Sequence, residues 1–320
     1  MRSFSQSDGC GVLIRGESLM DKTYLLFSKM KVHNANAASS AYTIGVPAMT
    51  AWTGFMYALE RYVRTQCKLE EVRFTGIAVS YHECELQTYR LDEYRTNIVG
   101  YAKPPKLDGN DGGIKAASFI EEARCHMCVS LLIELEGVNG KNEKKLLHAV
   151  RERMPRMKAA GGDIWTIFDE KNLNVHYVRD EKSMYKVRAR LMVGAMLKER
   201  LDLIQPTEAH DALDCLMDIQ RVMHKKIVEG QEDSKKVRWE SSKFIDKGWL
   251  VPIAVGFCDL SGPTDKLEGQ RDYGYEHHFV EPIVTVGEFM MPHRFNTLDE
   301  MMWRYDYDEV NGLYLCRQTM

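Results

Sequence analysis

Residues 31–66 read KVHNANAASSAYTIGVPAMTAWTGFMYALERYVRTQ and predict a strand that leads through a polar loop into a helix. The strand begins at Thr23 and carries apolar residues at every second position, as a half-buried strand does. The helix begins near Pro47, because proline suits a first helical turn. One strand face is expected to hold Tyr24, Leu26, Met30 and Val32, and one helix face Trp52, Phe55, Met56, Leu59 and Val63.

The loop between the strand and the helix is rich in side chains that both donate and accept hydrogen bonds. These side chains are separated by alanines, which leave room for an approaching backbone, so the loop suits contacts with phosphate, sugar or bases. Asparagine and serine are also ordinary turn and capping residues, and the pattern alone leaves that alternative open. The candidate RNA contacts in the loop are Asn34, Asn36, Ser39, Ser40 and Thr43.

Length and composition describe an ordinary globular chain. Its 320 residues allow two domains, or one domain with an insertion, and 44% hydrophobic and 28% charged residues fit a soluble protein. The net charge of −3 argues against general affinity for nucleic acid, so any such site must be a local basic patch. Eight irregularly spaced cysteines without a secretory signal indicate the cytoplasm.

Motifs of common enzyme and metal sites are missing from the sequence. There is no phosphate-binding loop, dinucleotide fingerprint, nucleophile elbow or zinc-protease motif. Cys125 and Cys128 form a lone C-x-x-C, and a structural zinc site usually needs two such pairs. We therefore expect no catalysis, no metal and no cofactor.

The run from Asn34 to Arg61 resembles the second Csy protein family of type I-F CRISPR surveillance complexes, Cas-five-type members of the repeat-associated (RAMP) superfamily. The resemblance continues along nearly the whole chain after residue 22. It recurs in the acidic pair, arginine and histidine of residues 121–126, in MKAAGGDI (157–164), in GWLVPIAVGF (248–257) and in EFMMPHR (288–294).

The order strand, helix, strand, strand, helix, strand, together with the resemblance, implies an α+β fold with a ferredoxin-like or RRM-like palm. The palm is expected to comprise residues 23–165 and 245–320, with a thumb-like hairpin at 88–117. Residues 1–22 are expected to be an N-terminal extension. Residues 166–244 depart most from the family pattern and are expected to be a mostly helical insertion.

Several further residues are candidates for RNA or partner contacts. Residues 141–158 hold seven basic and two acidic side chains, which is a credible phosphate-facing patch. In the thumb-like segment, basic residues alternate with tyrosines, a pattern that grips single strands but also occurs in solvated loops. The candidate RNA contacts outside the first loop are Arg124, His126, Arg156, Lys158, Trp249, His293 and Arg294, and the thumb or partner contacts are Arg90, Arg95, Lys103 and Lys106.

The resemblance implies a non-catalytic subunit that binds the 5′ handle of CRISPR RNA. Such a subunit pairs with the large subunit, abuts a backbone subunit and meets target double-stranded DNA through the complex. Two alternatives remain open. One is a metal-free endoribonuclease with His33, His82, His126 or His293 as general base. The other is a scaffold that binds only protein.

Overall fold

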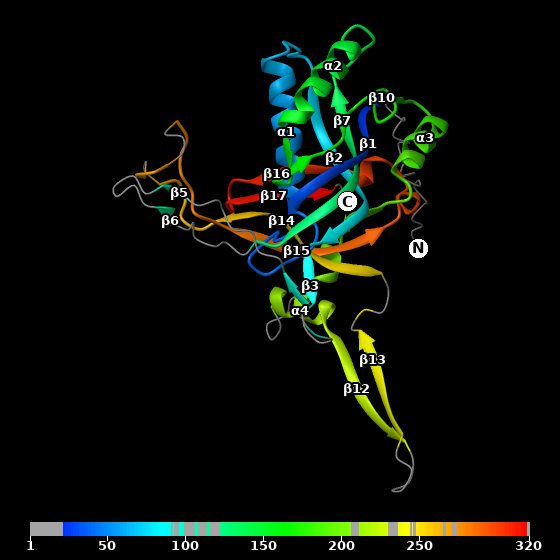
Figure 1. Ribbon diagram of the computed structural model, residues 1–320, viewed down its shortest axis with the longest axis vertical. Coiled ribbons are helices and arrows are strands. Elements are labelled where there is room, and N and C mark those ends of the chain that lie inside the picture. The colour runs from blue at the N-terminus through cyan, green and yellow to red at the C-terminus, as the bar shows by residue number, and fades with distance from the viewer. Residues whose placement is uncertain are drawn as a thin grey trace, which may run out of the picture.

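The computed structural model describes residues 22–90, 92, 96–98, 106–107, 114–115, 122–205, 211–229, 236–243, 245, 248–264, 267–270 and 274–318. Within these residues the chain is an α+β protein dominated by one antiparallel sheet (Figure 1). The expected N-terminal extension lies outside the described residues, apart from Lys22, which begins the first strand.

The N-terminal half builds the centre of this sheet. In chain order its elements are β1 (Lys22–Asn36), α1 (Met49–Thr65), β2 (Arg73–Leu86), β7 (Arg124–Glu136), α2 (Glu143–Arg153), η1 (Met154–Arg156), β8 (Lys158–Ala159) and β9 (Gly162–Ile164). The strands lie in the order β2–β7–β1–β9–β8, and β10 (Leu173–Val178) pairs with the first half of β1. All of these pairings are antiparallel.

The C-terminal strands extend the sheet beyond β2 and bring it back to the same strand. They are β14 (Trp249–Asp259), β15 (Val280–Met290), β16 (Trp303–Asp308) and β17 (Leu313–Gln318), in the order β15–β14–β17–β16–β2. β11 (Ala195–Glu199) pairs with both β15 and β2. The pairings β2–β16–β17–β14–β15–β11–β2 therefore form a closed circuit.

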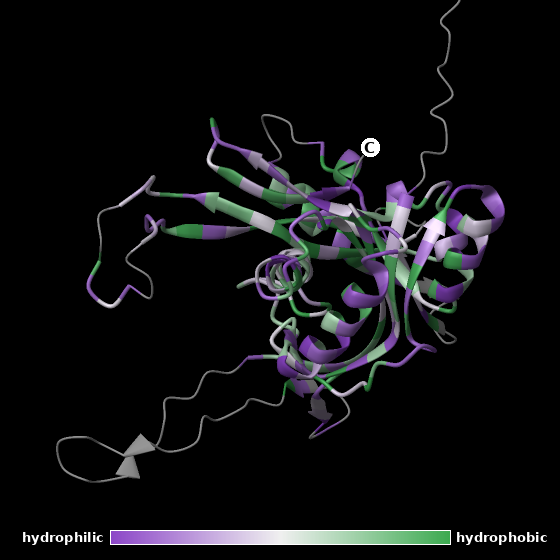
Figure 2. Cartoon of the chain, turned by 90° about the horizontal axis from the view of Figure 1, so that it is seen from above, coloured by the Kyte–Doolittle hydropathy of each residue, from purple (hydrophilic) through white to green (hydrophobic). Residues whose placement is uncertain are grey.

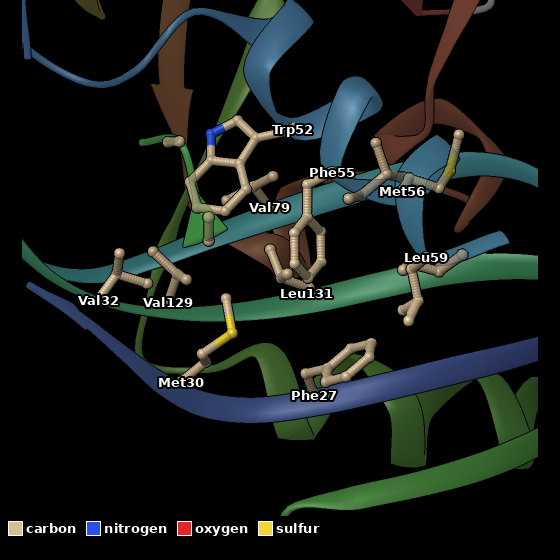
Figure 3. Close-up of a cluster of buried hydrophobic side chains, with 14 of the residues drawn as sticks. Phe27, Met30, Val32, Trp52, Phe55, Met56, Leu59, Val79, Val129 and Leu131 are labelled. Carbon is tan, nitrogen blue, oxygen red and sulfur yellow. The ribbon is translucent and has the colours of Figure 1, made fainter. Parts of the chain in front are cut away.

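Helix α1 lies over one face of β1, β7 and β2 and buries its apolar stripe there. Trp52, Phe55 and Leu59 point from α1 onto these strands (Figure 3). Leu146 and Val150 of α2 belong to the same core. The strands carry long hydrophobic stretches, whereas the helices show hydrophilic residues on their outer turns (Figure 2).

A bulge in β1 divides its apolar residues between the two faces of the sheet. The register with β7 shifts between Phe27 and Met30, and Lys29 has a positive φ of 52°. As a result Met30 packs in the α1 core, whereas Tyr24 packs in a second core on the opposite face. The prediction that these residues share one face was wrong, because a bulge reverses the alternation.

The second core lies under α3 (Glu181–Leu191), η3 (Pro292–Arg294) and η4 (Asp299–Met301). Val187 and Leu191 of α3 pack there with Tyr24, Leu26 and Phe295. This covers only part of the face opposite α1. Towards the C-terminal end of β1, Lys31 and Asn34 are exposed.

The interval 166–244 was expected to be mostly helical, and that expectation is wrong. Besides α3 it contains β10, β11, η2 (Leu201–Leu203), α4 (Ala212–Gln220), β12 (Val222–Glu229) and β13 (Lys236–Lys243). The apolar repeat of α4 continues into Val222 and Met223, but these two residues pair with Lys243 and Ser242 in a hairpin. The β12–β13 hairpin extends away from the rest of the molecule (Figure 1).

The expected thumb-like segment is described only in part. β3 (Thr88–Arg90) pairs with β4 (Thr96–Ile98), and β5 (Lys106–Leu107) pairs with β6 (Ile114–Lys115). Arg90 is exposed. Arg95, Lys103 and the side chain of Lys106 lie outside the described residues. No helix in the ranges given above is long and apolar enough to cross a membrane.

Candidate nucleic-acid interface

The uncovered part of the sheet forms a hollow of about 510 Å³. Three strands supply its lining. The lining residues are Lys31 and His33 of β1, Glu83, Cys84 and Glu85 of β2, and His126, Met127 and Cys128 of β7. We call this part of the molecule the open face.

Aromatic rings form a row at the edge of the open face. The indole of Trp165 stacks on the imidazole of His33 with ring centroids 4.3 Å apart and planes 5° apart. The imidazole of His126 lies 4.8 Å from that of His33, centroid to centroid. The backbone N–H of Trp165 donates to the Lys31 carbonyl at 2.9 Å, which holds the chain after β9 against β1. Trp165 remains 69% exposed, so its outer face is available for a further ring.

Asn34 fixes the orientation of His126. A second bulge gives Asn34 a φ of +55°, and its backbone N–H donates to His126 Nδ1 at 3.3 Å. On the other side of the ring, His126 Nε2 lies 3.0 Å from the side-chain amide nitrogen of Gln87. Gln87 Nε2 also donates to Asn34 Oδ1 at 2.8 Å. The three side chains form one polar network at the ends of β1, β2 and β7.

Arg124 lies beside this network. Its guanidinium pairs with Glu122 and donates to the Asn34 carbonyl at 3.4 Å. The Asn36 N–H donates to the Ala160 carbonyl at 2.8 Å, and the Asn36 side chain accepts from the Ala38 N–H at 3.1 Å. Among the described residues its carboxylate partner is Glu122, and a part-exposed guanidinium has further N–H groups that can reach phosphate or base edges.

A tight turn joins β8 to β9 next to Arg124. Ala160 and Gly161 both have positive φ, at 47° and 78°. A side chain at Gly162 would place its Cβ 2.6 Å from the His33 carbonyl oxygen, so only glycine allows β9 to approach β1 this closely. Lys158 in β8 pairs with Asp163 at 2.6 Å, and Arg156 is exposed at the end of η1.

The other loop candidates bond mainly to each other. The Thr43 hydroxyl lies 2.8 Å from the Ser39 hydroxyl and 2.7 Å from the Ser40 hydroxyl. Thr43 is only 4% exposed. These three residues thus shape the loop in the manner of turn residues, whereas Asn34 and Asn36 stand next to Arg124.

Trp249, His293 and Arg294 belong to another part of the sheet circuit. Trp249 begins β14, and its ring lies 4.8 Å from that of Phe289 in β15. Arg294 Nη1 lies 3.9 Å from Glu288 Oε1, and His293 is exposed beside it in η3. The structure therefore gathers Asn34, Asn36, Arg124, His126 and Lys158 near one turn and leaves these three residues elsewhere.

Trp165 and Gln87 were not among the residues expected from the sequence, and His33 was expected only as a general base. A tryptophan directly after MKAAGGDI, at the end of a short strand, was the available signal for Trp165. The signal for His33 was that it follows the buried Val32 in β1, so its side chain points to the other face of the strand. Gln87 follows β2 and carried no pattern of its own.

The fold and the site together define an α+β protein with one face of its sheet packed under helices. The opposite face remains partly open and carries stacked aromatic rings, amides and an arginine. These are the groups with which sheet proteins bind single-stranded nucleic acid.

The sequence profile of the family described as CRISPR-associated protein (Cas_Csy2) matches residues 25–316, and the chain belongs to this family. The chain is 29% identical over 313 residues to the CRISPR-associated protein Csy2 of Pseudomonas aeruginosa (strain UCBPP-PA14), covering 91% of this chain and 93% of that protein. The resemblance seen in the sequence is thereby confirmed. Membership of this family supports a role for the chain as a subunit of a type I-F CRISPR complex.

Proposed function

We propose that the chain is a non-catalytic RNA-binding subunit that holds the 5′ handle of CRISPR RNA. In this proposal it pairs with the large subunit of the type I-F complex and abuts a backbone subunit. Target double-stranded DNA is met through the assembled complex. Two observations support this function: the family membership and the groups on the open face.

The observation that carries the proposal is the row of rings formed by Trp165, His33 and His126. Splayed bases stack on aromatic rings at about 1–3 kcal/mol per base, whatever their identity. Arg124, Asn34 and Asn36 stand next to this row and offer donors and acceptors for phosphate and base edges. A stacking platform beside such groups suits a short single strand better than a duplex.

The strand order supports a ferredoxin-like or RRM-like palm. In chain order the elements β1, α1, β2, β7, α2 and β9 give the sheet order β2–β7–β1–β9, with both helices in one core. That is the arrangement of such palms, in which the face without helices commonly binds RNA. Residues 88–117 remain our proposed thumb-like segment.

The proposal is tested by co-expressing the chain with a type I-F large subunit and a CRISPR RNA. We expect a stable complex that retains intact RNA, with Trp165→Ala and Arg124→Ala each weakening retention of the handle. Tyr185→Ala is the matched control, because Tyr185 is equally exposed on α3 but not part of the open face. Assembly without dependence on either residue would instead favour a scaffold that binds only protein.

One observation favours the endoribonuclease as a second candidate. The imidazoles of His33 and His126 lie 4.8 Å apart on the open face, close enough to serve one reacting phosphate as base and acid. Incubation of the purified chain with repeat RNA distinguishes the candidates. Cleavage that is lost in both His33→Ala and His126→Ala would replace the binding proposal with the enzyme.

A further inference from the structure

An apolar pocket of about 480 Å³ lies beside the open face. It shares Glu83 and Cys84 with the hollow of the open face. These two residues are neighbours in β2, so the two spaces lie on either side of the C-terminal end of that strand. Its other walls come from the loop before α1, from the segment between α3 and β11, and from the β14–β15 pair. The residues used below are Ile44, Tyr81, Val193, Trp249 and Phe289.

One wall of the pocket is held tightly against β2. The Ser80 hydroxyl donates to the Leu191 carbonyl at 2.7 Å, and a Cβ added to Gly194 would lie 2.1 Å from the Ser80 oxygen. His82 Nε2 lies 2.7 Å from the Ser130 hydroxyl, which fixes its ring behind the same wall. Burial lowers the pKa of His82, which favours its neutral form. The pocket is therefore formed before any ligand arrives.

Aromatic rings form the floor and one side. Trp52 in the core donates its indole N–H to the Tyr81 hydroxyl at 2.9 Å. Tyr81 meets Phe289 edge to face, with centroids 6.1 Å apart, and Phe289 lies 4.8 Å from Trp249. This chain of rings leads from the core to the rim and anchors Trp249 on one side.

The rim exposes three large apolar side chains together. Trp249 is 65% exposed, Val193 is 77% exposed and Ile44 is 53% exposed. A cluster of exposed apolar groups around a preformed pocket marks a binding site rather than ordinary surface. An occupant that reaches from this pocket to the polar hollow must combine an apolar part with a polar part.

We propose that this pocket binds one nucleobase that is splayed out of the RNA strand on the open face. This inference rests on the proposed function, since the open face must hold the strand. The base stacks on Trp249, and its sugar and phosphate lie towards the open face. Glu83 on the shared wall offers a carboxylate acceptor for an amino group or ring N–H of the base.

The test uses the full chain with the 5′-handle RNA of a type I-F repeat. A series of such RNAs carries a single abasic site at each position in turn. We expect one position at which loss of the base weakens binding about tenfold, the range of base–aromatic stacking. Trp249→Ala should weaken binding of the intact RNA by a similar factor and should lose no more with that abasic RNA.

Two further variants make the test specific for the pocket. Val193→Trp fills the pocket from an exposed position and should reproduce the effect of Trp249→Ala. Tyr185→Ala removes a ring of similar exposure elsewhere and should bind like the original chain. Circular dichroism spectra and unfolding curves verify that each variant is folded.

The possible outcomes distinguish a pocket that binds RNA from a surface that binds the large subunit. If the original chain binds the RNA but no abasic position depends on Trp249, the pocket inference is overturned and the proposed function stands. If Trp249→Ala or Val193→Trp abolishes pairing with the large subunit while RNA binding persists, the pocket binds protein and the inference is wrong. If the chain binds no RNA at all, both proposals fail.

Discussion

The hydrogen bond between Trp52 and Tyr81 shows how one residue in a strand fixes a helix. Trp52 is fully buried, and its only hydrogen-bond acceptor recorded within the described residues is the Tyr81 hydroxyl. We expect Tyr81→Phe to lower the free energy of unfolding by about 1–3 kcal/mol, because a buried indole N–H loses its acceptor. Urea denaturation measures this, with Tyr185→Phe as an exposed control. An unchanged midpoint would contradict it.

Glu134 makes stability depend on pH. Burial opposes its charged form, but hydrogen bonds from Lys22 and Arg304 outweigh burial and hold its pKa below the ordinary value of 4.5. Because the folded pKa lies below the unfolded one, this stabilisation is present above the unfolded pKa and is lost as pH falls through the folded pKa. Asp299, which shares both cations, behaves alike.

We therefore expect Glu134→Gln to reduce the free energy of unfolding at neutral pH by about 1–3 kcal/mol, since two cations lose their anionic partner. The variant should also lose less stability than the original chain between pH 5 and pH 3. Urea curves across this range measure both effects, and Glu136→Gln at an exposed position of β7 is the control. Parallel pH profiles would show that Glu134 does not contribute.

At the scale of elements, glycine decides whether β9 can join the sheet. A Cβ at Gly162 would meet the backbone of His33 and Ala35 at 2.6–2.8 Å. Gly162→Ala should therefore destabilise the chain by about 1–3 kcal/mol and loosen the stack of Trp165 on His33. Gly54 in α1 is the matched control, because a Cβ there meets nothing within 4 Å. Gly54→Ala should stabilise by about 0.5–1 kcal/mol.

The β12–β13 hairpin is expected to contribute little to the stability of the body. Its two strands pair only with each other among the described strands. A short glycine–serine link in place of residues 222–243 should leave the melting temperature within about 2 °C, as for surface changes. Scanning calorimetry measures this. A larger fall would reveal that the hairpin packs on the body.

The elements that the sequence predicted correctly are those with strong local patterns. The apolar stripe of α1 led to the right type of element, and the expected start near Pro47 lies close to its first residue, Met49. The predictions failed where distant pairing decides. Within residues 166–244, Val222 continues the apolar repeat of α4 but pairs with Lys243 in the β12–β13 hairpin.

The candidate site was predictable in part for the same reason. Asn34, Arg124 and His126 stand in motifs that resemble the family, and the fold brings them together. The stack of Trp165 on His33 depends on two bulges and on the turn at Gly161, which no local pattern announces. Side-chain partners across strands can be found only once the register is known.

For the whole molecule, a net charge of −3 means that RNA binding must come from a few cations. We expect the slope of log affinity against log salt to flatten by about 0.7 in Arg124→Ala, the contribution of one phosphate contact on a single strand. Arg73 begins β2 and lies at the other end of this strand from the open face, so Arg73→Ala should leave the slope unchanged. Equal slopes in all three proteins would mean that Arg124 contacts no phosphate.

The closed circuit of strands also determines how long part of the sheet stays incomplete while the chain is synthesised. β2 ends at residue 86, but its partner β16 begins at residue 303, so a ribosome adds about 200 residues between them. At roughly 5–20 residues per second, the part of the β2 edge around Ile77 waits on the order of 10–40 s for Trp303 of β16, although Ser80 and Tyr81 can pair earlier with β11. During this interval the nascent chain presents an unpaired strand edge, which is a target for chaperones and for wrong partners alike.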